Sequence, residues 1–224
     1  MSEAPRDLRL WRLPRGRHGL PRELVERSQR ERLLAAVVRV SAEKGYEATS
    51  VADILEEAGV GRESFYELFD DKQACMVAAR QLLVEDLAEQ VQDAYERPGP
   101  WAERMRKALA AALDWFAADP VAGRVVMLEL SAMGPISRQL FQDEFGRFTR
   151  LVDAGLDGSD PQPEVPRATV LAVGAVFARI YDEVARGNAE GLPAMLPELT
   201  YEVLVPFVGE AGAREQERLA AAET

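Results

Sequence analysis

Apolar residues recur every three or four positions along most of this chain, which is the spacing of one face of an α-helix. The clearest runs lie within residues 33–40, 51–58, 76–95, 101–118 and 140–151. Prolines and glycines separate these runs, and the alternation typical of β-strands does not occur in the sequence. The pattern therefore predicts an all-α protein of about nine helices.

Residues 50–69 carry a more specific pattern, in which two short helices are joined by a tight turn. Ser50 followed by Asp53 predicts a capping box at the start of the first helix. Gly59 predicts the left-handed residue that ends this helix, and a second short helix is expected after Gly61. Two short helices around a glycine-containing turn are the signature of a helix-turn-helix.

The second helix of such a motif meets base edges near its N-terminus, so we expect Arg62, Glu63 and Ser64 to read bases. An arginine donates hydrogen bonds to guanine, and a carboxylate accepts one from cytosine N4. Phosphate contacts are expected from the polar side chains around the motif, namely Thr49, Ser50, Tyr66 and Lys72.

The flanks of the motif extend the pattern to Gly45-Tyr46-x-x-Thr49-Ser50-Val51-x-x-Ile54 and to Ala58-Gly59-Val60-Gly61-x-x-x-Phe65-Tyr66-x-x-Phe69-x-x-Lys72. From about Gln29 to Ala79 the chain resembles the DNA-binding domain of the TetR (tetracycline-repressor) family of transcriptional regulators. The resemblance implies a repressor that leaves its operator when a small molecule binds inside a helical regulatory domain. Three alternatives remain open at this point: a helix-turn-helix protein without a ligand switch, a helix-turn-helix used only for protein contacts, and an all-helical enzyme using carboxylates.

The charge distribution is unusual for a DNA-binding protein, because the net charge of the whole chain is −11. Residues 1–32 have a net charge of +4, whereas residues 33–72, which include the helix-turn-helix, have a net charge of −5. The basic patch therefore precedes the motif, in an N-terminal arm (residues 1–24) that we expect to be flexible. We expect Arg12, Arg15 and Arg17 of this arm to enter the minor groove of DNA.

Several classes of site are unlikely on composition alone. Cys75 is the only cysteine and His18 the only histidine, which argues against a disulfide, a Ser-His-Asp site or a histidine-based zinc site. The sequence carries no phosphate-binding loop or dinucleotide fingerprint, so no cofactor is expected. The longest uncharged apolar run, at residues 168–178, is too short to span a bilayer, and no secretory signal is evident. We therefore expect a cytoplasmic protein without membrane contact.

The helix boundaries follow from capping residues and prolines. The first helix is expected to begin at Pro21 or at Ser28, and the fourth at an Asp70 cap with Gln73 in the box position. Further helices are expected at residues 101–118, 121–132 and 136–156, with a loop at 157–166. These boundaries predict a DNA-binding domain at residues 25–72, a ligand-binding and dimerisation domain at 73–210, and a polar, frayed tail at 211–224.

The segments 167–186 and 193–208 are apolar on nearly all sides, with a proline, Pro206, expected to kink the end of the second. Such helices lie either in the core of one chain or between subunits, and we expect them to form a four-helix interface of a homodimer. The interface residues expected from this pattern are Val170, Gly174, Phe177, Tyr181, Leu199, Val203 and Phe207.

The resemblance also implies a cavity for a small molecule, which we expect to be apolar or aromatic because the available lining carries few charges. Aromatic residues and methionines at helical spacing are more often plain core, so this expectation depends on the structure. The lining residues expected are Leu83, Leu87, Trp115, Phe116, Met127, Phe141, Phe145 and Phe148.

Overall fold

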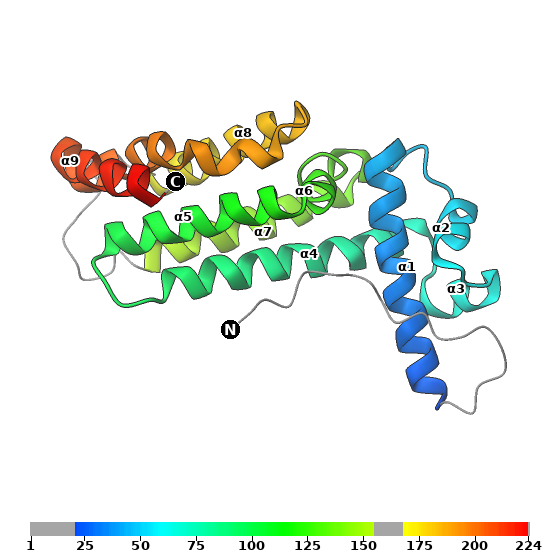
Figure 1. Cartoon of the computed structure of the whole chain (residues 1–224). Helices are drawn as coiled ribbons and strands as arrows, with labels where there is room; N and C mark the ends of the chain where they lie inside the picture. The colour runs from blue at the N-terminus through cyan, green and yellow to red at the C-terminus, as the bar shows by residue number, and fades with distance from the viewer. Residues whose placement is uncertain (1–20, 155–167, 224) are drawn as a thin grey trace. The chain divides into compact units, whose positions relative to one another are not determined.

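The computed structural model describes residues 21–154 and 168–223 (Figure 1). Within these ranges the chain forms nine α-helices and two short 3₁₀ helices, and no described residue lies in a strand, so the predicted all-α class is confirmed. The helices are α1 (Arg22–Lys44), α2 (Val51–Ala58), α3 (Arg62–Leu68), α4 (Lys72–Tyr95), α5 (Trp101–Ala118), α6 (Pro120–Met127), α7 (Ile136–Ala154), α8 (Ala168–Ala185) and α9 (Leu196–Glu223). The 3₁₀ helices are η1 (Ser131–Met133) and η2 (Ala189–Met195).

The chain divides into two compact units, and the boundary falls between Leu82 and Leu83, inside α4. Each unit has its own apolar core, because the buried faces of its helices are packed against one another. None of the described helices combines the length and the apolar character needed to cross a bilayer.

The first unit is built from α1, α2, α3 and the first part of α4. Its core contains Leu33, Val37, Ile54 and Phe65, each fully buried. α1 begins directly after Pro21, which agrees with the first of the two predicted starts. Pro21 suits this position because a helix has no acceptor within itself for its first backbone N–H groups.

The start of α4 differs from the prediction by one residue. The backbone N–H of Ala74 donates to Asp71 Oδ1 at 2.7 Å, so Asp71 and not Asp70 caps this helix. Phe69, which is buried and extended (φ −144°), ends α3 and leaves Asp70 in the turn that follows. The predicted cap at Asp70 is therefore wrong.

The second unit contains the remainder of α4 and helices α5 to α9. The predicted boundaries of α5 are confirmed, and Asp119 caps α6 by accepting a hydrogen bond from the N–H of Ala122 at 2.9 Å. α6 ends at Met127, earlier than predicted, because a turn and η1 follow and bury Leu130 and Met133.

The C-terminal segment is helical and packed, so the prediction of a frayed tail is wrong. α9 extends to Glu223 and is interrupted only at Gly209, whose φ of 69° is left-handed. Ala213 and Ala220 are fully buried, and the buried guanidinium of Arg106 contacts the side chains of Gln216 and Glu223. The interruption lies at Gly209 rather than at Pro206, because glycine adopts a positive φ without strain.

Candidate DNA-binding site and effector cavity

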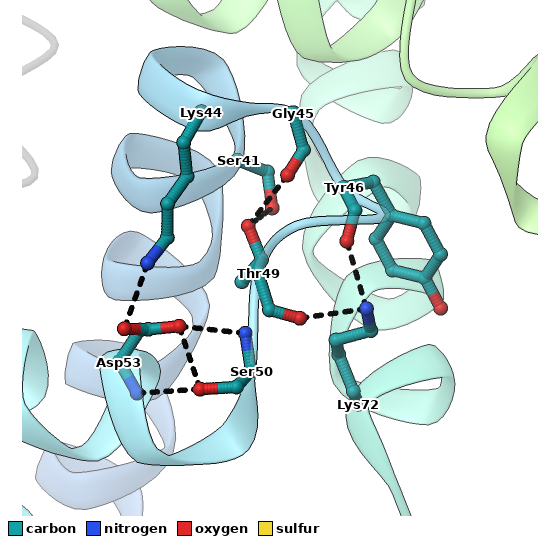
Figure 2. A network of polar contacts seen from close by, with 8 residues as sticks. All are labelled: Ser41, Lys44, Gly45, Tyr46, Thr49, Ser50, Asp53 and Lys72. Atoms are coloured by element: carbon teal, nitrogen blue, oxygen red, sulfur yellow. Dashed lines mark hydrogen bonds and ion pairs between the residues drawn. The ribbon is translucent and has the colours of Figure 1, made fainter.

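The helix-turn-helix is held in shape by the caps that the sequence predicts. The N–H of Asp53 donates to Ser50 Oγ at 3.2 Å, and the N–H of Ser50 donates to Asp53 Oδ2 at 2.7 Å, which completes a capping box (Figure 2). Gly59 ends α2 in the left-handed conformation, with φ 61°. α3 then begins after Gly61, as predicted.

The side chains expected to read bases are on the N-terminal turn of α3. Phe65 is fully buried and fixes one face of this short helix against the core, which leaves Arg62 and Glu63 exposed. Ser64 is half-buried and accepts a hydrogen bond from Gln29 Nε2 at 3.3 Å. Tyr66 remains 50% exposed, so its hydroxyl is accessible for the phosphate contact predicted from the sequence.

Lys72 is engaged inside the protein, which the sequence did not indicate. Its Nζ donates to the carbonyls of Tyr46 and Thr49, both at 2.7 Å, and lies 4.2 Å from the centre of the Tyr46 ring (Figure 2). These contacts attach the first turn of α4 to the loop between α1 and α2. The geometry gives Lys72 a structural role, and its phosphate contact stays a prediction, because two of the three N–H donors of the ammonium group are used within this loop.

Thr49 has a similar supporting role. Its side chain is buried and its hydroxyl donates to the carbonyl of Gly45 at 2.8 Å, while Ser41 Oγ donates to Thr49 Oγ1 at 3.3 Å. A buried hydroxyl with these partners is not available to a phosphate, so this prediction is wrong. Ser50 is exposed and remains available beside the cap.

The electrostatic environment of the capping box is set by Lys44. Its Nζ lies 2.7 Å from Asp53 Oδ1, and the hydroxyl of Ser50 donates to Asp53 Oδ2 at 2.6 Å. The hydrogen bond from Lys44, followed by those from Ser50, holds the pKa of Asp53 well below its usual range. The predicted minor-groove residues Arg12, Arg15 and Arg17 lie outside the described residues.

The second unit contains a partly open apolar cavity of about 100 Å³. Every described residue that lines it has an aliphatic, aromatic or thioether side chain. Of the residues predicted for a cavity, four are part of this lining: Leu87, Phe116, Met127 and Phe148. The sequence therefore indicated the walls contributed by α4, α5, α6 and α7.

Two residues predicted to line the cavity, Trp115 and Leu83, do not line it. Trp115 is 1% exposed, and its Nε1 donates to Asp86 Oδ2 at 2.5 Å, so the indole joins α5 to α4. Leu83 packs against the core without lining the cavity. These two assignments are wrong: Phe116, next to Trp115, and Leu87, one helical turn after Leu83, line the cavity instead.

The wall formed by α8 was not expected. Ala172, Val173, Val176, Phe177 and Ile180 all line the cavity. The segment is apolar on nearly all sides, so periodicity alone gives no indication of which side faces inward.

A second, more open hollow of about 480 Å³ adjoins the cavity. Phe141 and Phe145 line this hollow and not the cavity, which corrects their predicted place. Met127 and Phe177 line both spaces. The hollow also has polar lining, contributed by Ser131, Ser137, Arg138 and Tyr181.

The residues expected at a dimer interface fall into two groups. On α8, Val170 and Tyr181 are 47% and 50% exposed, and their neighbour Leu171 is 63% exposed. On α9, Leu199, Val203 and Phe207 are buried within the chain, and the Phe207 ring packs against Trp101 with ring centres 5.1 Å apart. The prediction is therefore wrong for these three residues, because their side chains form the core of one subunit.

Phe177 and Gly174 complete the predicted interface set. The Phe177 ring packs edge-to-face on Phe141, with ring centres 5.4 Å apart, and so has an intrachain role. Gly174 is half-buried on α8 and lines the open hollow. Within the described residues, no group of three or more histidine, cysteine or carboxylate side chains is arranged to hold a metal ion.

The observed features define a class of protein: an all-α chain with an N-terminal helix-turn-helix unit and a helical second unit that contains an apolar cavity. Residues 33–79 match the family model described as bacterial regulatory proteins, tetR family. The helix-turn-helix unit is thus a TetR-family DNA-binding domain, and the resemblance read from the sequence is confirmed.

Comparison with known proteins agrees with this assignment. The chain is 41% identical over 51 residues to an uncharacterized HTH-type transcriptional regulator in the lacX 3′ region of Lactococcus lactis subsp. lactis, which covers 22% of this chain and 26% of that protein. The match spans only about a quarter of the length of this curated relative.

Solved structures share the fold over most of the chain. A TetR family transcription regulator from Marinobacter aquaeolei VT8 has a TM-score of 0.66 and 22% identity, covering 83% of this chain and 98% of that one. The transcriptional regulator FadR from Bacillus subtilis, in complex with stearoyl-CoA, has a TM-score of 0.66 and 18% identity, covering 80% and 97%.

Proposed function

We propose that this protein is a sequence-specific transcriptional regulator, a repressor that a small molecule releases from a palindromic operator, and not an enzyme. The observation that carries the proposal is the exposed N-terminal turn of α3, which presents Arg62 and Glu63 from a TetR-family helix-turn-helix. In this class of motif that turn enters the major groove of DNA. A protein that acts on the chromosome in this way works in the cytoplasm of a bacterium.

The first test is selection of bound sequences from random duplex DNA, followed by sequencing. The wild-type chain is expected to select a palindrome, and Arg62→Ala is expected to lose about 1–3 kcal/mol of binding free energy and to relax the preference at one base pair. Arg39→Ala is the matched control, because Arg39 is on α1 and pairs with Glu57 at 2.7 Å. A uniform loss of affinity across all sequences would make Arg62 a phosphate contact instead.

The N-terminal arm supplies positive charge in this proposal, because residues 33–72 are net negative. Each phosphate neutralised by Arg12, Arg15 or Arg17 contributes about 0.9 to the slope of log affinity against log salt concentration. Deletion of residues 1–20 is therefore expected to weaken DNA binding and to flatten this slope by up to about 3. An unchanged slope would show that the arm makes no phosphate contact.

We propose further that the effector binds in the apolar cavity of the second unit. Two observations support this: the lining is apolar throughout its described residues, and the structurally similar FadR binds stearoyl-CoA. Helix α4 belongs to both units and so links effector binding to DNA binding. Its residues Lys72 and Cys75 contact the loop and core of the first unit. Its residues Leu87 and Val91 line the cavity. An effector that prefers the non-binding state by about 1.4 kcal/mol lowers DNA affinity tenfold, and the DNA lowers effector affinity by the same factor.

The cavity proposal is tested by filling the space in two steps. Ala112, which lines the cavity on α5, is replaced by Leu and then by Trp. Effector response is expected to weaken with Ala112→Leu and to disappear with Ala112→Trp, while DNA binding without effector is retained. A response that survives Ala112→Trp in a folded protein would place the effector elsewhere.

We also propose that the protein binds DNA as a homodimer through the exposed face of α8. Val170 and Leu171 leave about half or more of their apolar side chains exposed on one helix, and Tyr181, which also lines the hollow, is similarly exposed. Two-fold symmetry explains why a palindromic operator is expected, with half-sites about 34–36 Å apart or wider.

A further inference from the structure

The cavity and the adjoining hollow differ sharply in chemistry, although they share two lining residues. The cavity is apolar throughout its described lining, whereas the hollow has Ser131, Ser137, Arg138 and Tyr181 among its walls. Met127 and Phe177 line both spaces and so stand where one meets the other. A ligand that fills both would be apolar at one end and polar at the other.

Only a hydrocarbon group can be buried in the cavity without losing hydrogen bonds to water. A carbonyl, hydroxyl or charged group placed there would lose its hydrogen bonds to water and gain none from the described lining, which is unfavourable. Burial of hydrocarbon in the same space is favourable, because it removes apolar surface from water. The inner part of the ligand is therefore a hydrocarbon group.

The polar side of the hollow favours a negative charge. The hydroxyl protons of Ser131 and Ser137 are already donated to the carbonyls of Leu128 (3.2 Å) and Gly134 (2.6 Å). Arg138 is exposed, and no carboxylate of the described residues forms an ion pair with it. Since a guanidinium carries a positive charge and five N–H donors, a negatively charged oxygen is the acceptor that it binds most strongly.

The two spaces are bordered in common by apolar side chains. Met127 is unbranched and adapts its shape to irregular neighbours. Phe177 packs edge-to-face on Phe141, and Phe141 is stacked on Phe145 with ring centres 5.6 Å apart. A hydrocarbon group that reaches from the hollow towards the cavity therefore meets apolar surface at Met127 and Phe177.

We propose that the effector is an anionic amphiphile whose hydrocarbon part lies in the cavity and whose negatively charged head group Arg138 binds in the hollow. This inference rests on the proposed function in one respect, namely that the cavity is the effector site. It differs from the sequence-based expectation of a purely apolar or aromatic effector.

The test is calorimetric titration of the full-length protein, without DNA, with three probes that share a twelve-carbon chain: dodecanoate, dodecan-1-ol and dodecyltrimethylammonium, each below its micelle concentration or solubility limit. Dodecanoate is expected to bind most tightly and the cationic probe most weakly. Equal affinities for the three probes, or tightest binding of the cation, would overturn the proposal.

Two matched variants on α7 locate the head group. Arg138→Gln is expected to lower dodecanoate affinity about fivefold or more and to change dodecan-1-ol affinity less than twofold. Arg147→Gln is the control, because Arg147 is exposed on the same helix and lines neither space. Equal effects of the two variants on dodecanoate would overturn the assignment of Arg138.

Failure of the ligand inference can be distinguished from failure of the proposed function. If the protein selects a palindrome and dodecan-1-ol releases it as well as dodecanoate does, the proposed function stands and the anionic head group is wrong. If dodecanoate binds through Arg138 but no DNA sequence is selected, the ligand inference stands and the proposed regulator is wrong.

Discussion

Lys72 occupies the first position of α4, and its ammonium group lies between two carbonyls of the loop that joins α1 to α2. A hydrogen bond that involves a charged group contributes about 1.5–3 kcal/mol when it is shielded from water. Because Lys72 is half-buried, its two bonds and its contact with the Tyr46 ring favour a structural role.

The first prediction follows from this geometry. Lys72→Gln is expected to lower the free energy of unfolding by about 1–3 kcal/mol, because the carbonyls of Tyr46 and Thr49 lose a charged donor. Urea unfolding followed by circular dichroism measures this change. Arg27→Gln is the control, since Arg27 contributes only an exposed ion pair with Glu31 on α1 and its loss is expected to be smaller. If Lys72→Gln leaves stability unchanged but weakens DNA binding, Lys72 contacts a phosphate and does not stabilise the loop.

The second prediction concerns the pH dependence of the capping box. Lys44 and Ser50 lower the pKa of Asp53 in the folded protein, so its contribution to stability is fully present above the unfolded-state value of 3.8. That contribution is lost as the pH falls below about 3.8 towards the lower pKa of the folded state. Asp53→Asn is therefore expected to destabilise the protein at pH 7, by an amount that shrinks on acidification to pH 3.

Unfolding curves of Asp53→Asn and wild type across this pH range provide the measurement. Asp93→Asn serves as the control, because Asp93 is exposed on α4 and its replacement is expected to leave stability unchanged at pH 7. A difference between Asp53→Asn and wild type that stays constant down to pH 3 would contradict the role of the ionised carboxylate.

At the scale of single elements, the helix ends were predicted best, because they depend on residues close in sequence. The caps at Ser50, Gly59 and Asp119 were predicted because each depends on a side chain or conformation within three or four residues of the helix end. The site on α3 followed from the same motif. The role of Lys72 was not predicted because its partners, the carbonyls of Tyr46 and Thr49, come close only in the folded loop. Thr49 was misassigned because its burial depends on how this loop packs, although its acceptor, the carbonyl of Gly45, is near in sequence.

The predictions that failed for α8 and for the end of α9 concern contacts between residues far apart in the sequence. Arg106 on α5 contacts Gln216 and Glu223, more than a hundred residues further along the chain, and this contact holds the end of α9 in place. The composition of that segment, polar and rich in alanine, gives no sign of it. In the same way, only packing decides which side of α8 lines the cavity.

The third prediction tests whether the C-terminal segment is part of the core. Ala213→Asp places a carboxylate at a fully buried position of α9 and is expected to lower the free energy of unfolding by about 2–4 kcal/mol. Ala211→Asp introduces the same charge two residues earlier at an exposed position, where the change is expected to stay below about 0.5 kcal/mol. Thermal unfolding of the two variants decides the matter: equal melting temperatures would mean that the segment is frayed.

At the scale of the whole molecule, the exposed apolar side chains of α8 lead to the fourth prediction. Leu171→Asp is expected to convert the dimer to a folded monomer, because it places an unpaired charge in the proposed interface. Val121→Asp is the control, since Val121 is 43% exposed on α6 and outside that interface.

Sedimentation equilibrium measures the masses of both variants, and circular dichroism checks that each is folded. The expected result is a monomer for Leu171→Asp and a dimer for Val121→Asp. A dimer in both cases would show that α8 does not form the interface by this face.

The burial of Trp101 and Trp115 has a practical consequence for spectroscopy. The chain has three tryptophans, and the residues from 21 to 82 contain none, so both buried indoles belong to the second unit. Their fluorescence is therefore expected to be blue-shifted in the folded protein and to report the unfolding of that unit, whereas circular dichroism reports the helices of both. A melting experiment that records the two signals together would show, without any label, whether the DNA-binding unit loses its structure at the same temperature as the unit that holds the cavity.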